Sequence, residues 1–257
     1  MRNAQFMVTL ILFVFAVANL PAQEKTATMA EVMAARTAHD DARMETLRAS
    51  LAEQAGKDKE SFQVQWDAAE CFRMSTTDLR TKRQASNLEG KEAKELKKQQ
   101  ELWAAQGLVY GERALALAKT ETEVAAAHRV VGELYANSIT SMVAGFKNGP
   151  KARNHMDEAM KRTPDDPECQ RAIGIMYLNN PPISGGDVPK AIETFSHCHE
   201  LKPDNDEYMV MLAMAYQKDK QWDKALEAAD KALALNPANS SAAALRARIV
   251  AKEEGAE

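Results

Sequence analysis

The feature that most constrains this fold is a pattern of about 34 residues that recurs along the chain and reads as two helices joined by a turn. Its clearest copy, residues 206–237, reads DEYMVMLAMAYQKDKQWDKALEAADKALALNP. With Asp206 as position 1, small or apolar residues occupy positions 7, 8, 11, 20, 24 and 27, and Pro237 occupies position 32. Small residues at positions 8 and 20 let two helices approach closely, and the proline ends the second helix.

The same spacing recurs upstream with extra residues between the two helices. Gly132 and Pro164 occupy positions 8 and 32 of one copy, which has eight extra residues, and Gly174 and Pro203 do so in the next, which has five. A weaker first copy has 26 extra residues and Lys119 in place of the proline. One helix pair cannot bury its apolar face alone, so the copies are expected to stack.

These positions resemble the tetratricopeptide repeat, whose pattern is W-x2-L-G-x2-Y, then A-x3-F, then P. The resemblance implies an all-α fold, a right-handed α-solenoid of stacked helix pairs, and a protein-binding scaffold without enzymatic activity. The stretches GPKA at 149–152 and GGDVPKAI at 185–192 also resemble bacterial exported tetratricopeptide proteins and, more weakly, the regulator of microtubule dynamics family. Such short stretches do not justify carrying over a microtubule function.

The repeats define the domain organisation that we expect. The predicted segments are a signal peptide at 1–22, an N-terminal capping helix at 24–56, a divergent first repeat with a helical insertion at 62–121, three tetratricopeptide repeats at 125–239, and a C-terminal capping helix and tail at 240–257. The insertion is rich in charge and is expected to be a solvated helical arm.

The N-terminus predicts export. The apolar run 6–18 follows an early positive charge and precedes small residues, as in a secretory signal peptide. At 13 residues it is shorter than the roughly 20 of a membrane span. We expect a periplasmic or secreted protein without a stable membrane span after cleavage; the alternative is an uncleaved signal that anchors the chain. Cys71, Cys169 and Cys198 are expected to be small packing residues on helices.

Charge and motifs exclude several functions. The chain has 33 Lys and Arg against 37 Asp and Glu, which is not the basic surface expected of a nucleic-acid-binding protein. It has no HExxH pair, paired CxxC or Walker glycine loop. His197, Cys198 and His199 are consecutive on a predicted helix, so their side chains diverge by about 100° and cannot meet at one metal ion. We therefore predict no catalytic site, metal or cofactor.

A partner-binding groove is the strongest functional hypothesis. The family resemblance implies that positions 2, 5, 9, 12 and 13 of each first helix line the concave face. The candidate groove residues are Arg129, Glu133, Asn137, Arg171, Ile175, Asn179, Met214 and Gln217, with Trp66, Glu70, Arg73 and Val210 as further members. Arginine binds carboxylates bidentately and an asparagine amide can hold a peptide backbone. The predicted partner is an extended peptide or acidic segment of a protein.

Two alternatives stand beside this hypothesis. The chain is a small-ligand-binding accessory of an envelope transport system if the concave side encloses a cavity or pore. The segments 145–150 and 179–187 between paired helices form a second candidate surface, because insertions in repeats often map to a binding face. They are rich in turn residues, and Phe146 and Ile183 are candidate exposed apolar contacts there.

Overall fold

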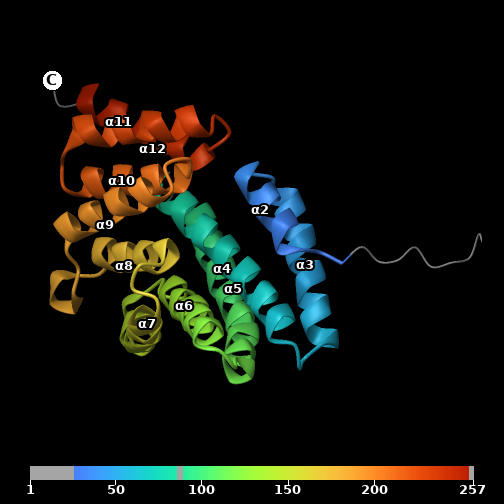
Figure 1. Ribbon diagram of the computed structural model, residues 1–257. Helices are drawn as coiled ribbons and strands as arrows, with labels where there is room; N and C mark the ends of the chain where they lie inside the picture. Colours follow the sequence, from blue (N-terminus) through green and yellow to red (C-terminus); the bar gives the residue numbers. More distant parts are fainter. Residues whose placement is uncertain (1–25, 86–88, 255–257) are drawn as a thin grey trace, which may run out of the picture.

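The computed structural model describes residues 26–85 and 89–254, so the predicted signal peptide and residues 255–257 lie outside the described residues. Within these ranges the chain forms 11 α-helices and one 3-10 turn and contains no strand (Figure 1), which confirms the all-α prediction. The elements are α2 (Met29–Thr37), α3 (Asp41–Lys57), α4 (Phe62–Ala85), α5 (Gly90–Leu117), α6 (Glu121–Asn137), α7 (Met142–Arg162), α8 (Pro167–Asn179), η1 (Pro182–Ser184), α9 (Val188–Leu201), α10 (Asp206–Lys218), α11 (Trp222–Leu235) and α12 (Ser240–Glu254).

Close helix pairing explains the small residues of the repeat. The pairs are α4 with α5, α6 with α7, α8 with α9, and α10 with α11, and each packs along its length. A Cβ added to Gly174 of α8 would lie 2.5 Å from Cε1 of Phe195 on α9. A Cβ added to Gly132 of α6 would lie 3.0 Å from Sδ of Met156 on α7. Glycine at position 8 therefore leaves room for the large side chains of Phe195 and Met156 at position 24.

Helix ends follow the local signals in the sequence. Helices α7, α9 and α11 each end two residues before a proline, namely Pro164, Pro203 and Pro237. Asp187 caps α9 by accepting a hydrogen bond from the Lys190 amide at 3.1 Å. Capping side chains satisfy amides that have no partner within the helix.

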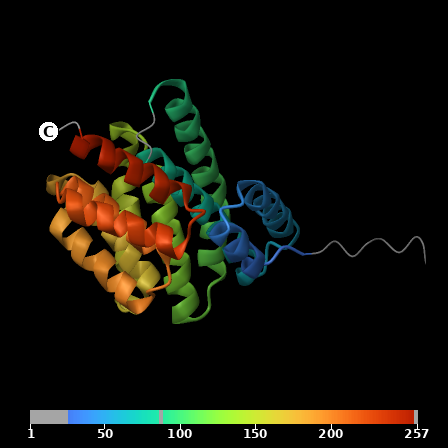
Figure 2. The same ribbon diagram turned by 90° about the horizontal axis from the view of Figure 1, so that it is seen from above.

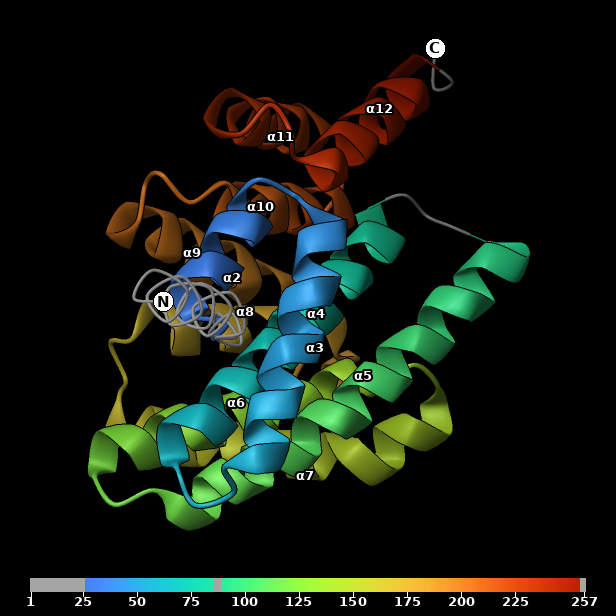
Figure 3. The same ribbon diagram turned by 90° about the vertical axis from the view of Figure 1, so that its right-hand side faces the viewer.

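One of the predicted insertions has a different structure from the one expected, and another has the expected structure. Segment 145–150, expected as an insertion rich in turn residues between paired helices, is helical and contains Pro150 in the interior of α7. The proline removes only the hydrogen bond to the carbonyl of Phe146, and this part of α7 lies at the surface where water can replace the bond. The charged insertion before residue 100 extends α5 as the predicted helical arm, which projects from the body (Figures 2 and 3).

The N-terminal cap is two helices, not the single helix predicted. The chain turns at Ala38, and His39 adopts a φ of 50° before Asp40 caps α3. Leu47 and Leu51 of α3 are buried against α4. Between Met33 and Met44 the only apolar residues are alanines, which suit a helix, so the sequence does not mark the break clearly.

The two ends of the solenoid meet. Helices α2 and α3 lie across α4 (Figure 3), and α12 also packs against α4. Asn236, after α11, donates a hydrogen bond to the Thr37 carbonyl at 2.9 Å, and Arg248 of α12 donates one to the Gln84 carbonyl at 2.5 Å. The helices at the two ends of the chain, α2, α3 and α12, therefore narrow the concave side of the solenoid.

Two further observations concern the described residues. All three cysteines are free and buried, in agreement with the predicted packing role. No helix in the described part of the chain is both long enough and apolar enough to cross a bilayer.

Candidate binding site on the concave face

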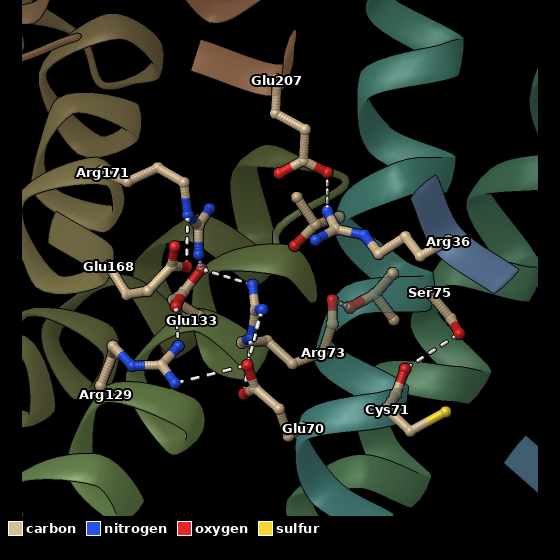
Figure 4. Close-up of polar contacts among 12 residues, drawn as sticks. Arg36, Glu70, Cys71, Arg73, Ser75, Arg129, Glu133, Glu168, Arg171 and Glu207 are labelled. Atoms are coloured by element: carbon tan, nitrogen blue, oxygen red, sulfur yellow. Dashed lines mark hydrogen bonds and ion pairs between the residues drawn. The ribbon is translucent and has the colours of Figure 1, made fainter. Parts of the chain in front are cut away.

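Neighbouring first helices each contribute an arginine and a glutamate to one buried cluster (Figure 4). Each pair is three or four residues apart, so both side chains emerge on the same face of their helix. We call this set the concave ion network; its members are Glu70 and Arg73 on α4, Arg129 and Glu133 on α6, and Glu168 and Arg171 on α8.

Glu133 lies at the centre of the concave ion network. Its Oε2 accepts hydrogen bonds from Arg171 at 2.5 Å and Arg73 at 3.2 Å. Its Oε1 accepts one from Arg129 at 2.9 Å. Arg73 also donates a hydrogen bond to each carboxylate oxygen of Glu70, at 2.8 Å, and Arg129 donates one to Glu70 at 3.3 Å. One carboxylate therefore joins three helices.

The arginines keep these buried carboxylates ionised. Burial by itself raises the pKa of Glu70, but Arg129 and Arg73 outweigh it and hold that pKa at about 2. Burial likewise opposes ionisation of Glu133, and Arg171, Arg73 and Arg129 bring its pKa below the ordinary value. Opposite charges at hydrogen-bond distance stabilise the charged form of a group that has lost its water.

The network continues to both ends of the chain. Arg36 of α2 donates to Asp78 of α4 at 2.9 Å and also pairs with Glu207 of α10. Tyr208 of α10 donates to Glu168 at 3.0 Å. Polar contacts thus join α4, α6 and α8 in one cluster (Figure 4). Arg36 and Tyr208 add separate contacts that link α2 with α4 and α10, and α10 with α8.

The prediction of an exposed groove is wrong for half of its residues. Arg129, Glu133, Asn137 and Arg171 are only 1–5% exposed, so a partner cannot reach them in this fold. The prediction assumed an open concave face, whereas the 24-residue α4 and the N-terminal helices cover it. Of the further members, Glu70, Arg73 and Val210 are buried as well, and Trp66 is partly buried.

The side chain of Asn137, predicted to bind a partner, makes its hydrogen bonds within the chain. The side-chain amide nitrogen donates to Thr76 and Thr77 of α4, at 3.0 Å each. Its oxygen accepts a hydrogen bond from Arg80 at 3.3 Å. The amide expected to hold a peptide backbone therefore holds α4 instead.

The other four predicted residues remain partly exposed. Ile175 and Asn179 lie toward the end of α8, and Met214 and Gln217 lie toward the end of α10. Gln84 of α4 donates to the Asn179 side-chain oxygen at 2.9 Å. These residues therefore form one edge of the concave face, beside the end of α4.

Four cations, which sequence reasoning missed, surround this edge. We call them the basic rim: Arg80 and Arg83 of α4, Lys218 of α10 and Arg248 of α12. The RTKR run at 80–83 was a signal that could have been noticed, whereas nothing in the sequence marks Arg248. Arg248 reaches this edge only because α12 packs against α4.

The basic rim differs from the concave ion network in its partners. Lys218 donates to the Leu178 carbonyl, and Arg248 donates to the side-chain oxygen of Gln217. Within the described residues, the Nε of Arg83 is buried without a hydrogen-bond partner. The partners found for the rim are thus carbonyl and amide oxygens, not carboxylates.

Desolvation dominates the pKa values of the rim. Burial and the nearby Arg83 together lower the pKa of Arg80 to about 10, against a smaller opposite effect of Glu133. Burial also lowers the pKa of Arg83, Lys218 and Arg248. A lowered pKa in a cation means that its charge is less well stabilised in the protein than in water.

Comparison with known proteins agrees with this architecture. Residues 183–249 match the family model described as tetratricopeptide repeat. A thermophilic tetratricopeptide-repeat protein of Thermus thermophilus, TTC0263, has a similar structure, with a TM-score of 0.59 and 14% identity, over 86% of this chain and 98% of that one. This chain has the tetratricopeptide-repeat fold. No protein with a curated function matches the sequence.

A second solved structure is more distant. YrrB, described as a tetratricopeptide-repeat protein with an unusual peptide-binding site, shares 14% identity over 86% of this chain and 92% of its own. Its TM-score is 0.42, so no inference about this chain is drawn from it. The fold by itself is typical of scaffolds for protein-protein interaction, and the site must come from this chain's own residues.

Proposed function

We propose that this tetratricopeptide-repeat protein is an exported, non-catalytic scaffold that binds an extended acidic segment of a partner protein at the basic rim. The observation that carries the proposal is the set of four cations, Arg80, Arg83, Lys218 and Arg248, which lie beside the partly exposed residues of the predicted groove. The hydrogen-bond acceptors found for them are neutral carbonyl and amide oxygens. This modifies the hypothesis drawn from the sequence by moving the site from the centre of the concave face to its edge.

Electrostatics favours an acidic ligand at this edge. The rim cations have already lost part of their water, so a carboxylate that approaches them gains a strong interaction at a small further desolvation cost. Arginine side chains can also hold a carboxylate through two parallel hydrogen bonds. In the concave ion network the equivalent interactions are already made within the chain.

Neighbouring groups can orient a peptide. Ile175 and Met214 offer apolar surface, and the side chains of Asn179 and Gln217 carry amide groups able to hydrogen bond with a backbone. An extended segment with carboxylates fits these groups better than a compact ligand does, because they are distributed over the ends of two helices.

The geometry does not favour the alternative of a small-ligand accessory. The cavity between α4, α6 and α8, lined by Arg80, Glu133 and Ile175, has a volume of about 10 Å³. The one beside His39 and Glu207 has about 40 Å³. Small-molecule sites usually measure about 300–1,000 Å³, and these two cavities of the concave side hold one or two waters at most. The larger hollows, about 560 Å³ along α11 and about 410 Å³ between α8 and α9, lie off the concave face, where this alternative needs an enclosed cavity.

Peptide binding is tested with fluorescently labelled peptides of equal length, one rich in Glu and Asp and one in which Gln and Asn replace them. We expect the acidic peptide to bind more tightly and its affinity to fall as salt is added. The double variant Arg83→Gln and Arg248→Gln should weaken binding by about tenfold or more, as the loss of a charged hydrogen bond implies.

The matched control is Arg246→Gln, which lies two residues from Arg248 on the same helix but pairs with Asp230 at 2.5 Å. It should leave the affinity unchanged. Equal affinity of both peptides, or an equal loss in the Arg246 control, would disprove the rim site. Pull-down from the exported fraction, followed by mass spectrometry, then identifies the partner.

Export is tested separately. We expect the chain in the periplasmic or secreted fraction, with its first residue after the predicted signal peptide when the N-terminus is sequenced. An intact N-terminus in the membrane fraction would support the anchored alternative, and an intact one in the cytoplasmic fraction would contradict export.

A further inference from the structure

The most exposed large apolar side chains of the described chain gather at one edge, away from the concave face. Met142, Val143 and Phe146, on the first two turns of α7, are 79–80% exposed. Ile183, in η1 between α8 and α9, is 96% exposed. Exposed apolar groups in such a cluster mark an interaction surface more often than isolated ones do.

One contact brings Ile183 to the same side as α7. Arg153 of α7 donates a hydrogen bond to the carbonyl of Ser184 at 2.5 Å and lies against Gly185. Phe146 precedes Arg153 by seven residues, which is two helical turns or about 10 Å along the same face. Figure 1 shows the connection between α8 and α9 beside α7. We call Met142, Val143, Phe146 and Ile183 the apolar edge.

Within α7 the charge beside the apolar edge is positive, while Glu101 of α5 accepts a hydrogen bond from Thr140 just before the helix. From Ser141 to His155, α7 carries Lys147, Lys151 and Arg153 and no acidic residue. All three of these cations are at least partly exposed. Lys151 lies over the Tyr135 ring at 5.0 Å, with its charge still available to solvent. An occupant of this edge therefore combines apolar material with negative charge.

Shape distinguishes between possible occupants. The best-formed hollows of the described surface lie along α11, between α8 and α9, and on the concave face. At the apolar edge the side chains are 79–96% exposed, so they stand out into solvent, and α7 also carries the exposed Lys147, Lys151 and Arg153. A partner helix is normally received in a groove, whereas protruding apolar side chains ringed by Lys and Arg can enter the boundary between lipid headgroups and acyl chains.

We propose that the apolar edge docks the protein onto an anionic membrane surface, with Phe146 and Ile183 inserted among the lipids and Lys147 and Lys151 against their headgroups. The attraction of basic residues to anionic lipid falls off within a Debye length, so it acts only where these side chains reach the surface. The basic rim is not involved, and the two sites can be tested independently.

The test uses the full chain with a single dye whose emission shifts to the blue in an apolar environment. Phe146→Cys and Ile183→Cys provide the attachment points, and labelling is selective because the three native cysteines are buried. The probe is vesicles of about 70% phosphatidylcholine and 30% phosphatidylglycerol, with pure phosphatidylcholine as the neutral comparison. We expect a blue shift at both positions with the anionic vesicles and little with the neutral ones.

Controls separate this edge from attachment by other parts of the chain. A dye on Leu235→Cys, at an exposed apolar position of α11, should not shift, even if the N-terminal apolar run holds the chain on the vesicle. Lys147→Gln with Lys151→Gln should weaken vesicle binding, followed by the shift at Phe146→Cys as lipid is added, by about thirtyfold, at about 1 kcal/mol per cation near the surface. The matched pair Lys224→Gln with Lys231→Gln, on α11, should leave it unchanged.

Three results would overturn the proposal. The first is the absence of a blue shift at residues 146 and 183 with anionic vesicles. The second is an equal blue shift at residue 235. The third is a blue shift of the labelled variant when unlabelled protein is added without vesicles. The last result would show that a second copy covers the apolar edge. Circular dichroism of every variant excludes loss of the fold as the cause.

Discussion

At the residue scale, Glu133 makes the most consequential contacts, because its carboxylate accepts hydrogen bonds from three buried arginines. Replacing it by glutamine keeps the shape but leaves Arg73 and Arg171 without their shared countercharge. We expect Glu133→Gln to lower the free energy of unfolding by about 3–5 kcal/mol, the range for a broken buried ion pair. Urea denaturation measures it.

The control for this prediction is Glu227→Gln. Glu227 pairs with Lys231 on the exposed side of α11, so its loss should leave the free energy of unfolding almost unchanged. A change below about 1 kcal/mol for Glu133→Gln would mean that the concave ion network contributes little to stability.

Glu70 gives a prediction about acid stability. Its pKa is about 2 in the folded chain against 4.5 ordinarily, since Arg129 and Arg73 outweigh the effect of burial. The unfolded state therefore takes up the proton first, and the stabilisation is complete above about pH 4.5 and is lost as the pH falls toward 2. The shift corresponds to about 3 kcal/mol. Urea unfolding at a series of acidic pH values should show this loss.

The variant Glu70→Gln identifies the source of that pH dependence. It should be less stable than the original chain at neutral pH, yet its stability should fall less between pH 4.5 and 2. An unchanged slope in that interval would assign the effect to other carboxylates.

Sequence reasoning recognised these residues as special but not their environment. Arg129 and Arg171 recur at one position of adjacent repeats, and that recurrence is visible in the sequence. Whether such residues face solvent depends on the length and path of α4, and on Arg36, which is distant in sequence. A local pattern contains no information about such long-range packing.

At the element scale, the pairing of α8 with α9 predicts a strict requirement for glycine. In Gly174→Ala the new methyl would lie 2.5 Å from the ring of Phe195, which is fully buried and has no room to move. Overpacking costs about 1–3 kcal/mol, which outweighs the roughly 1 kcal/mol that alanine contributes to a helix. Thermal unfolding should show a lower midpoint.

Gly56→Ala is the matched control within a helix. Nothing lies within 4 Å of the added Cβ there, so the helix preference acts alone and stability should rise by up to about 1 kcal/mol. Equal effects at Gly56 and Gly174 would contradict close packing of α8 on α9.

The contact between α6 and α7 predicts sensitivity to mild acid. Nδ1 of His128 lies 3.0 Å from Nδ1 of His155, so one ring must donate and the other accept. Burial lowers the pKa of both histidines. The pKa of His128 is lowered further by His155 and Arg162 and raised by Glu158 and Glu112. The pKa of His155 is raised by Glu112 and lowered further by Lys151.

A lowered histidine pKa means that the unfolded state binds the proton first. The stability from this contact should therefore be complete above about pH 6.5 and decrease as the pH falls below that value. Urea unfolding between pH 8 and 5.5 measures the decrease. His155→Gln should make this decrease smaller, whereas His197→Gln, on the exposed side of α9, should leave it unchanged. An equal decrease in both variants would disprove the assignment of the pH dependence to His128 and His155.

Elements with strong periodicity were predictable, and interruptions were not. The repeat located the paired helices because it combines apolar spacing with closing prolines such as Pro203 and Pro237. The turn at His39 has no glycine or proline to mark it, and Pro150 lies inside a helix because the lost hydrogen bond is at the surface. Both cases depend on tertiary packing, which overrides the local preference.

At the scale of the whole molecule, the solenoid is closed by its own ends. In an open repeat protein each unit contacts only its neighbours, and terminal units unfold separately. Here Arg36 of α2 pairs with both Asp78 of α4 and Glu207 of α10, while α12 packs against α4. The first and last elements should therefore protect one another from local unfolding.

Hydrogen exchange followed by mass spectrometry tests this coupling. Arg36→Met retains the aliphatic bulk but removes both ion pairs, and we expect amide exchange to accelerate about tenfold in α2 and in α10, as a loss of about 1.4 kcal/mol implies. Exchange in α7 should not change. The control Arg43→Met removes only the contact with Glu31 of α2, at 3.2 Å, and should leave α10 unaffected. Unchanged exchange in α10 of Arg36→Met would show that the two ends are stabilised independently, as in an open solenoid.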